Sequence, residues 1–323
     1  MSLLFRALTA AVAPAGERSR LSVFYFHRTP AEPDPLLPSE PDARMFDQIL
    51  GWIGSQFRVL DPLEACDRLY DGTLPSRPAV ITFDDGYRDN FTVAFPILQR
   101  HRMRAAFFVA TAFLDGGMMF NDRVIEAVRR CRGGSISFTG AQGDPVRLPA
   151  SSDLERRRAI DAILAAIKHL PPEDREEQVA RIERDAGIAS RAPTSVAKMM
   201  DPDQVASLHR SGMRIGGHTR THPILVKMDD GAARAEIAGG LDDLAGIIGE
   251  RPSLFAYPNG RNGTDFDARH VSMLEESGVR FAFTTHAGTA TRQASKLELP
   301  RFTPWDRSRH KFGVRAWMNA FGH

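Results

Sequence analysis

Residues 79–86 read AVITFDDG, an apolar run that stops at two carboxylates and a glycine. An unbroken apolar run of this length predicts a strand buried on both faces, as in a parallel sheet. Helical patterns separate it from similar runs, and strands that alternate with helices indicate parallel strands joined by right-handed crossovers. Roughly seven or eight such strands indicate an α/β barrel, incomplete or distorted. The expected strands are residues 21–27, 79–83, 105–110, 213–217, 253–257, 280–284 and 297–302.

The composition excludes several classes of protein. A chain of 323 residues is long enough for two ordinary domains or for one large barrel. Hydrophobic residues make up 42% and charged residues 25%, as in soluble globular proteins. The formal net charge is only +2, so the basic bias of a nucleic-acid-binding protein is missing. Cys66 and Cys131 form no CxxC motif, so we expect free thiols in a reducing compartment rather than a disulfide framework.

The N-terminal stretch bears on location. No apolar run in the chain reaches the roughly 18 residues of a transmembrane helix. Residues 1–16, MSLLFRALTAAVAPAG, share small and apolar residues with a signal peptide, but Arg6 lies inside the apolar stretch rather than ahead of it. We predict a short amphipathic helix with Leu3, Leu4 and Leu8 on one side. A cytoplasmic location is therefore expected, with secretion or the periplasm as the alternative.

The alternation of predicted strands and helices is interrupted between about residues 121 and 200. Ser152 and Glu155 have the spacing of a capping box, which predicts the start of a helix, and a highly charged helix is expected at 173–185. We therefore predict a helical lobe inserted into the barrel. The expected organisation is an N-terminal helix or tail at 1–20, the barrel at 21–306 with the insertion at about 121–200, and a C-terminal helical tail at 307–323.

Polar side chains gather where the expected strands end. His27 ends the first strand, Asp84 and Asp85 end another, and His218 and His222 follow a third. In parallel β/α folds the active site lies at the carboxyl ends of the strands. These side chains are therefore the first candidates for a functional site.

Two of these motifs have the donor groups of a metal site. One of Asp84 and Asp85 can ligate a metal while the other acts as a base, although an aspartate here would also cap the following helix. His218 and His222 are four residues apart, a spacing common among metal ligands, although two surface histidines would give the same pattern. Pro223 disfavours α geometry at His222, so a loop is expected there.

One carboxylate and two imidazoles would leave metal positions open for water or substrate. That composition is typical of a catalytic rather than a structural site. A bound metal can lower the pKa of water from 15.7 to about 7, and the remaining aspartate can act as the base. The residues therefore predict metal-assisted hydrolysis of a carbonyl derivative.

Three motifs carry a resemblance to a known family. TFDDG at 82–86 and HTRTH at 218–222 are similar to the first two motifs of the polysaccharide deacetylase family, the NodB-homology group or carbohydrate esterase family 4. FAYPNG at 255–260 resembles the third-motif region of its exopolysaccharide-locus members. The resemblance covers about residues 21–302, interrupted by the lobe. It implies a distorted (β/α)7 barrel that removes N-acetyl groups from an aminosugar polymer with a divalent metal, usually zinc.

The resemblance also implies roles for individual residues. Asp84 matches the catalytic base, and Asp85, His218 and His222 match the metal ligands. The third motif of the family usually carries an arginine that steadies the base, and FAYPNG has none. Arg301, in LPRF, is our candidate for that arginine.

The general acid of the family is usually a histidine on a late strand, and no such strand is apparent here. Circularly permuted members carry this histidine on the first strand, where residues 25–27, YFH, look similar. We therefore expect His27 to be the general acid, although it would also serve to anchor the loop to Pro30. His286, in FTTHAG, is the alternative acid.

Candidate substrate contacts lie near the same rim. Sugar rings stack on aromatic faces such as those of Tyr87, Tyr257 and Trp305, although core packing would also explain the last two. Backbone N–H groups around Tyr87 could stabilise an oxyanion. The full candidate set is Tyr87, Tyr257, Pro258, Asn259, Arg301 and Trp305.

The expected function is that of a metal-dependent hydrolase that removes N-acetyl groups from N-acetylhexosamine units of a polysaccharide or its precursor. Its partner is a carbohydrate substrate, without nucleic acid, and the sequence indicates no oligomeric state. Two alternatives stay open. One is a deacylase of a small non-polymeric amide on the same fold, and the other is a non-catalytic carbohydrate-binding relative, against which the intact TFDDG and HTxxH motifs argue.

Overall fold

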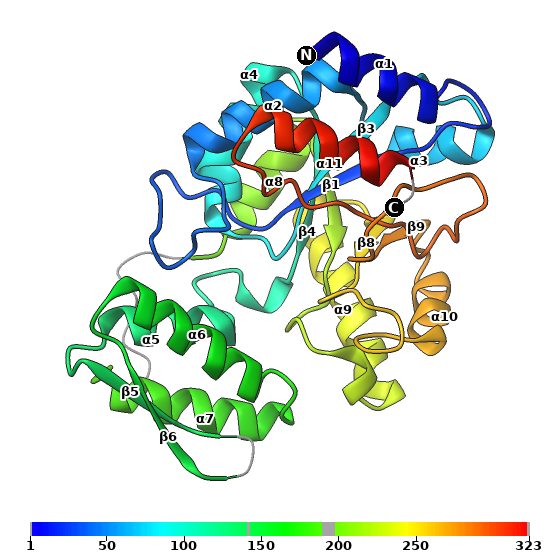
Figure 1. Ribbon diagram of the computed structural model, residues 1–323. Helices are drawn as coiled ribbons and strands as arrows, with labels where there is room; N and C mark the ends of the chain where they lie inside the picture. The colour runs from blue at the N-terminus through cyan, green and yellow to red at the C-terminus, as the bar shows by residue number, and fades with distance from the viewer. Residues whose placement is uncertain (1, 141–142, 189–197, 322–323) are drawn as a thin grey trace. The chain divides into compact units, whose positions relative to one another are not determined.

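A computed structural model describes residues 2–140, 143–188 and 198–321 (Figure 1). The chain forms two compact units. The first, which we call the barrel unit, comprises Met1–Glu32, Ser39–Gly116 and Met199–His323. The second, which we call the accessory unit, comprises Pro33–Pro38 and Gly117–Lys198.

Parallel strands build the barrel unit, as the apolar runs predict. Seven strands of the described residues form one sheet in the order β1-β3-β4-β7-β8-β9, with β2 also paired to β3. Every pairing in this sheet is parallel. β3 is buried at all of its positions, which explains its unbroken apolar sequence. The strands are β1 (Ser22–Phe26), β2 (Arg58–Val59), β3 (Pro78–Phe83), β4 (Ala105–Val109), β7 (Arg214–Gly217), β8 (Leu254–Ala256) and β9 (Phe281–Phe283).

A segment near residue 300 links the two outer strands of this sheet. Leu299 forms a parallel bridge with Phe283 of β9, and Phe302 forms one with Phe24 of β1. The predicted last strand is thus a pair of bridges, because the chain crosses from one outer strand to the other between Leu299 and Phe302. The distorted α/β barrel expected from the sequence is confirmed.

Side chains alternate between the two faces of the curled sheet. Phe108 of β4 and Phe283 of β9 have ring centroids 5.4 Å apart, although their strands are not neighbours in the sheet. The face that carries both rings is therefore the concave, inner face. Val23, Val80 and Ala256 belong to the same buried cluster. Because strand side chains alternate with a period of two, every second residue beyond these also tends to point inward.

Helices pack around the sheet and close one end of it. Asp61 caps α3, and its carboxylate pairs with Arg104 and Arg214, which precede β4 and begin β7. α3 thus lies at the amino ends of the strands. Within the described ranges, no helix combines the length and the apolarity that crossing a bilayer requires. The helices are α1 (Ser2–Val12), α2 (Ala43–Gln56), α3 (Pro62–Asp71), α4 (Phe95–His101), α8 (Pro202–Arg210), α9 (Asp230–Ile248), α10 (Ala268–Glu276) and α11 (Arg309–Phe321), with the short turns η1 (Asn90–Ala94), η2 (Thr111–Phe113) and η3 (Leu225–Lys227).

The N-terminal helix packs through a residue outside the expected leucine side. Leu4 is 59% exposed, and the side chain of Leu3 lies outside the described residues. α1 instead packs on α11 through Phe5, whose ring occupies the space beside Gly313 where a Cβ would lie. Leu8 is half-buried, so Leu4 is the expected leucine that lies away from the packed side among the described side chains.

The accessory unit has its own buried core and is not purely helical. Its helices pack with an antiparallel strand pair that the sequence-based expectation of a helical lobe missed. One of these strands, PVRLP, is exposed at alternate positions and carries two prolines, so its strand signal is weak. The elements are α5 (Phe120–Arg130), α6 (Asp153–Ile167), α7 (Pro172–Asp185), β5 (Ser135–Thr139) and β6 (Pro145–Pro149).

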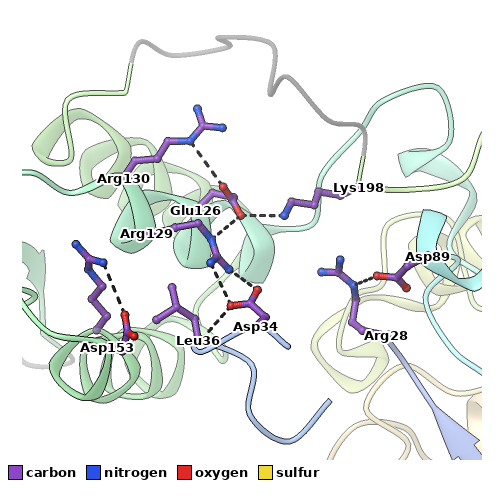
Figure 2. A network of polar contacts seen from close by, with 10 residues as sticks. Arg28, Asp34, Leu36, Asp89, Glu126, Arg129, Arg130, Asp153 and Lys198 are labelled. Atoms are coloured by element: carbon purple, nitrogen blue, oxygen red, sulfur yellow. Dashed lines mark hydrogen bonds and ion pairs between the residues drawn. The ribbon is translucent and has the colours of Figure 1, made fainter. Parts of the chain in front are cut away.

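A polar network ties an early segment of the chain into the accessory unit (Figure 2). Arg129 donates to the two oxygens of Asp34 at 3.1 and 2.6 Å and also pairs with Glu126. Lys198 lies 2.9 Å from the same glutamate. Leu36 adds an apolar contact to the core of this unit. Residues 33–38 therefore belong to the accessory unit, although the sequence suggested that they belong to the barrel.

Candidate active site

Three side chains from two motifs converge beyond the carboxyl ends of β3 and β7. One carboxylate oxygen of Asp85 lies 3.3 Å from Nε2 of His218 and 3.4 Å from Nε2 of His222. One donor atom of each residue lies within 4.8 Å of the other two. The Asp85 oxygen is buried and has no hydrogen-bond partner among the described residues. An orphaned carboxylate oxygen that faces two imidazole nitrogens fits a divalent metal with the ligand preferences of zinc.

The backbone of both motifs adopts conformations that L-residues rarely take. Asp85, Thr219 and His222 have φ of 77°, 62° and 54°, all in the left-handed region. Gly86 follows at φ 87°, and a Cβ there would meet Val109 at 2.9 Å, so glycine is required at this position. Backbone strain of this kind is retained at functional sites because the surrounding structure enforces it.

A hydrogen bond orients the first imidazole. Nδ1 of His218 lies 2.7 Å from the carbonyl oxygen of Ala256, at the end of β8. Since a carbonyl only accepts, Nδ1 carries a proton and donates it, and Nε2 is the atom that faces Asp85. A histidine held in this way is prepared for metal ligation through Nε2.

Thr219 stabilises the turn between the two histidines. Its hydroxyl donates to the carbonyl oxygen of His218 at 2.5 Å and accepts the backbone N–H of His222 at 3.1 Å. The motif lies in a loop, so the prediction that His222 is not helical is confirmed.

Burial and charge together set the protonation of the candidate ligands. Burial would raise the pKa of Asp85, but the two imidazoles outweigh it and hold that pKa below its usual range. Burial lowers the pKa of His222 to about 4, so this imidazole is neutral at neutral pH. Burial would also lower the pKa of His218, but Asp85 and Asp84 outweigh it and raise that pKa. A metal that binds here would therefore compete with a proton at His218.

Asp84 faces a different partner. Its two oxygens accept hydrogen bonds from the two terminal nitrogens of Arg301, each at 2.7 Å, and both side chains are buried. Arg301 is itself held by a bond from Nε to the carbonyl oxygen of Thr284 at 2.8 Å. Burial would raise the pKa of Asp84, but Arg301 outweighs it, so the carboxylate is ionised at neutral pH. Arg301 thus lies where an arginine that orients Asp84 is needed.

The strand register brings His27 to the same place. β1 and β3 pair in parallel as far as Phe26 and Phe83, and the backbone N–H of Asp84 donates to the carbonyl oxygen of Phe26 at 2.9 Å. His27 therefore follows directly beside Asp84. By contrast, the alternative acid His286 is exposed.

Tyr25 connects His27 with the buried ion pair. Its ring lies edge-on to the His27 ring, with centroids 5.6 Å apart. The guanidinium of Arg301 lies 4.5 Å from the centre of the same tyrosine ring. One contiguous row on the inner face, at the carboxyl ends of the strands, is therefore formed by Asp84, Arg301, Tyr25 and His27.

Residues just after the TFDDG motif hold the segment that contains His27. Asn90 is buried, and its side-chain nitrogen donates to the carbonyl oxygen of His27 at 2.8 Å. Asp89 accepts from Nε of Arg28 at 2.7 Å (Figure 2). It also accepts from the backbone N–H of Thr29 at 3.1 Å. Asn90 begins the π-helical turn η1, a feature that is frequent at functional sites.

Most of the candidate substrate contacts have buried side chains. Tyr257 is fully buried and stacks on a phenylalanine ring, with centroids 3.6 Å apart. Tyr87 is only 3% exposed, and the guanidinium of Arg28 lies 4.4 Å from its ring centre. Pro258 is buried as well, and Arg301 is covered through its pair with Asp84. These side chains support the site and present little surface to a ligand.

Trp305 and Asn259 do present surface. Trp305 is 56% exposed and lies three residues after Phe302, whose parallel bridge to Phe24 directs the chain toward the carboxyl ends of the strands. The guanidinium of Arg315 lies 5.7 Å from its ring centre and pairs with Asp306. Asn259 is half-buried at φ 60°, a conformation that asparagine tolerates well.

The sequence analysis did not identify three residues that contact the His27 segment, namely Asp89, Asn90 and Tyr25. Asp89 and Asn90 follow TFDDG closely, and this proximity is the signal that could have pointed to them. Tyr25 lies two residues before His27 on the same strand face, which is a weaker signal. The contacts of Asp89, Asn90 and Tyr25 depend on the order of the strands in the sheet, and no single sequence motif encodes that order.

Comparisons with known proteins find similarity in sequence and in fold. A family model described as polysaccharide deacetylase matches residues 71–136 and 165–282. YxkH of Bacillus subtilis (strain 168), a protein named for the same activity, is 38% identical over 66 residues. That match spans 20% of this chain and 24% of the relative.

Solved structures share the fold at low sequence identity. The Streptococcus pyogenes deacetylase PplD, solved in complex with acetate, matches with a TM-score of 0.61 at 17% identity, over 92% of this chain and 98% of that one. IcaB from Ammonifex degensii matches with a TM-score of 0.60 at 19% identity, over 94% and 98% of the two chains. At these identities the likeness establishes the fold alone.

Proposed function

This chain belongs to the polysaccharide deacetylase family, and on that premise we propose that it is a metal-dependent hydrolase that removes N-acetyl groups from N-acetylhexosamine units of a polysaccharide or its precursor. The main support for the proposal is that the adjacent carboxylates of Asp84 and Asp85 contact different partners. Asp85 faces His218 and His222, whereas Asp84 is held by Arg301. In the proposed site, a metal position and an ionised carboxylate would lie side by side.

In this proposal a divalent metal, with zinc as the first choice, is held by Asp85, His218 and His222. When bound, it would supply Lewis acidity toward the acetyl carbonyl and would acidify a water molecule. Three protein ligands leave coordination positions free, as catalytic sites require.

Side chains of the protein perform the proton transfers. Asp84, ionised at neutral pH and kept in one orientation by Arg301, accepts a proton from the attacking water. His27 donates a proton to the amide nitrogen as its bond to the acetyl carbon breaks. Acetate then leaves and the sugar keeps a free amine. A positioned acid or base contributes about 10²–10⁴-fold to the rate.

Trp305 and Asn259 are the proposed sugar contacts. An exposed indole offers a flat apolar face for a pyranose ring, and an amide side chain offers hydrogen bonds to its hydroxyl groups. The near-neutral charge of the chain suits a substrate that need not be strongly anionic. PplD, which has this fold, was solved with acetate, the acid that the proposed reaction releases.

Acetate release from a panel of N-acetylated oligosaccharides tests the proposal. Release from N-acetylhexosamine oligomers should stop after chelation and return when zinc is added. Release from small amides alone would favour the non-polymeric alternative. Binding of the oligomers without any release by the zinc-loaded protein would favour the carbohydrate-binding alternative.

A further inference from the structure

The turn between the two candidate imidazoles rests on one side chain of α9. Glu236 accepts the backbone N–H of Arg220 at 2.9 Å and that of Thr221 at 2.8 Å on a single carboxylate oxygen. Its other oxygen accepts the hydroxyl of Thr221 at 2.8 Å. Three donors of the turn that joins His218 to His222 thus converge on one carboxylate.

This turn needs an acceptor from outside because its backbone is irregular. Thr219 and His222 both have positive φ, so the residues between them pair in neither a helix nor a sheet. Backbone N–H groups without a partner are costly, and hydrogen bonds to an ionised acceptor are about twice as strong as neutral ones. Glu236 therefore stabilises a conformation that the turn would not keep by itself.

The same face of α9 makes two more contacts with the turn. A Cβ at Gly240 would lie 2.8 Å from the carbonyl oxygen of Thr219, so glycine allows the helix to approach the turn closely. Asp243 accepts Nε of Arg220 at 2.9 Å. Residues three and four apart share one side of a helix, so these positions and Glu236 form a row against the turn.

We propose that Glu236 is a positioning residue for metal binding, acting through the turn that presents His222. Glu236 can act in this way only if Asp85, His218 and His222 hold the metal, as the proposed function requires. Loss of the outer groups that orient metal ligands typically weakens metal binding about 10–100-fold. Glu236 is half-buried at the surface of α9, so its removal leaves no cavity in the core.

Titration of the chelated full-length protein with Zn²⁺ and with Co²⁺ measures the effect. Glu236→Ala should raise the Kd for both ions about 10–100-fold. It should also change the visible absorption of the bound Co²⁺, because that spectrum reports ligand geometry. Glu236→Gln keeps the volume and one carbonyl oxygen, so it should lose less affinity than the alanine variant.

Asp242→Ala is the matched control. Asp242 lies on the same helix and pairs with Arg251 in an exposed ion pair. Its removal takes away one carboxylate from α9 without touching the turn, so the Kd for both ions should stay at the wild-type value.

The outcomes distinguish Glu236 from the proposed metal site itself. If His222→Ala binds metal as tightly as wild type, the ligand assignment is wrong and the proposed function fails with it. If His222→Ala loses the metal while Glu236→Ala keeps the wild-type Kd, the role of Glu236 is overturned and the proposed function stands. Should Glu236→Ala unfold, Glu236→Gln and Thr221→Val carry the test, since both must weaken metal binding, and wild-type affinity in both overturns the role.

Discussion

Two adjacent aspartates at the end of β3 make different direct contacts. Asp84 meets the buried guanidinium of Arg301, whereas Asp85, at positive φ, meets His218 and His222. A permanent cation neutralises one carboxylate, and the other keeps an oxygen without a hydrogen bond. Neighbouring residues of the same type can therefore take the roles of base and metal ligand.

Asp84→Asn should stop turnover while metal stays bound. Asparagine keeps the shape of the side chain but accepts no proton, and the loss of a positioned base costs about 10²–10⁴-fold. Arg301 would also lose its buried counter-charge, so the free energy of unfolding should fall by up to about 3–5 kcal/mol. Acetate release, metal content and thermal unfolding of the same preparation measure the three effects. Loss of metal from this variant would contradict the assignment of Asp84 as the base.

His27→Ala should keep the metal and lose most of kcat, by about 10²–10⁴-fold, because the departing amine would lack its proton donor. Steady-state kinetics at saturating zinc, with metal content measured in parallel, provide the readout. His286→Ala is the control, because His286 is exposed and should be dispensable. If the His286 variant is inactive and the His27 variant is near normal, the two assignments must be exchanged.

At the scale of elements, the candidate site residues lie at the ends of strands, and neighbouring turns and helices hold them by hydrogen bonds. The alternation of side chains on β1 and β3 leads to His27 and Asp84 at one end of the inner face. Behind these strand ends, η1 holds the His27 segment through Asn90. α9 holds the turn before His222 through Glu236. The two supports are separate, so each can be tested without the other.

Asn90→Ala should lower kcat about 10–100-fold and leave the Kd for zinc unchanged. Its side-chain nitrogen donates to the carbonyl oxygen of His27, and a small displacement of a catalytic group can cost about 100-fold. The kinetic constants and the metal affinity should be compared with those of Thr92→Ala, an exposed position in the same turn. A weaker metal affinity with normal kcat would mean that Asn90 supports the metal ligands instead.

At the scale of the whole molecule, the chain forms a second unit that contains a network of charged side chains (Figure 2). Burial would raise the pKa of Asp34, but Arg129 outweighs it and lowers that pKa. Burial would likewise raise the pKa of Glu126, but Lys198 and Arg129 outweigh it. Both carboxylates therefore bind protons less readily in the folded unit than in the unfolded chain.

Acid should destabilise the accessory unit through these two groups. Because their folded pKa values lie below the unfolded ones, their stabilising contribution is complete above about pH 4.3 and is lost as the pH falls through the folded values. Hydrogen exchange of α5, followed from pH 6 down to about pH 3, should show falling protection in this range. Glu126→Gln should flatten that dependence. An unchanged pH profile in this variant would mean that Glu126 does not contribute.

The fold was more predictable than the contacts of the site. Apolar runs located all strands of the barrel sheet except β2, which has only two residues and no hydrophobic pattern. The strands β5 and β6 were not predicted, because short, half-exposed strands resemble loops in sequence. Tyr257 was expected near a rim because it ends the predicted strand 253–257, with core packing as the alternative, and the structure shows it buried.

By itself, the sequence determined most strands and helices of the barrel unit and the types of side chain at the strand ends. These are local properties, since hydrophobic periodicity sets each element and parallel topology brings the carboxyl ends of the strands together. The family resemblance already predicts Arg301 as the partner of Asp84, and the structure shows that contact. Only the tertiary structure decided that Asn90 meets His27 and that Glu236 meets the turn before His222. Such contacts join distant parts of the chain. They depend on which strands are neighbours and on how each helix is rotated against the sheet, which no single stretch of sequence encodes.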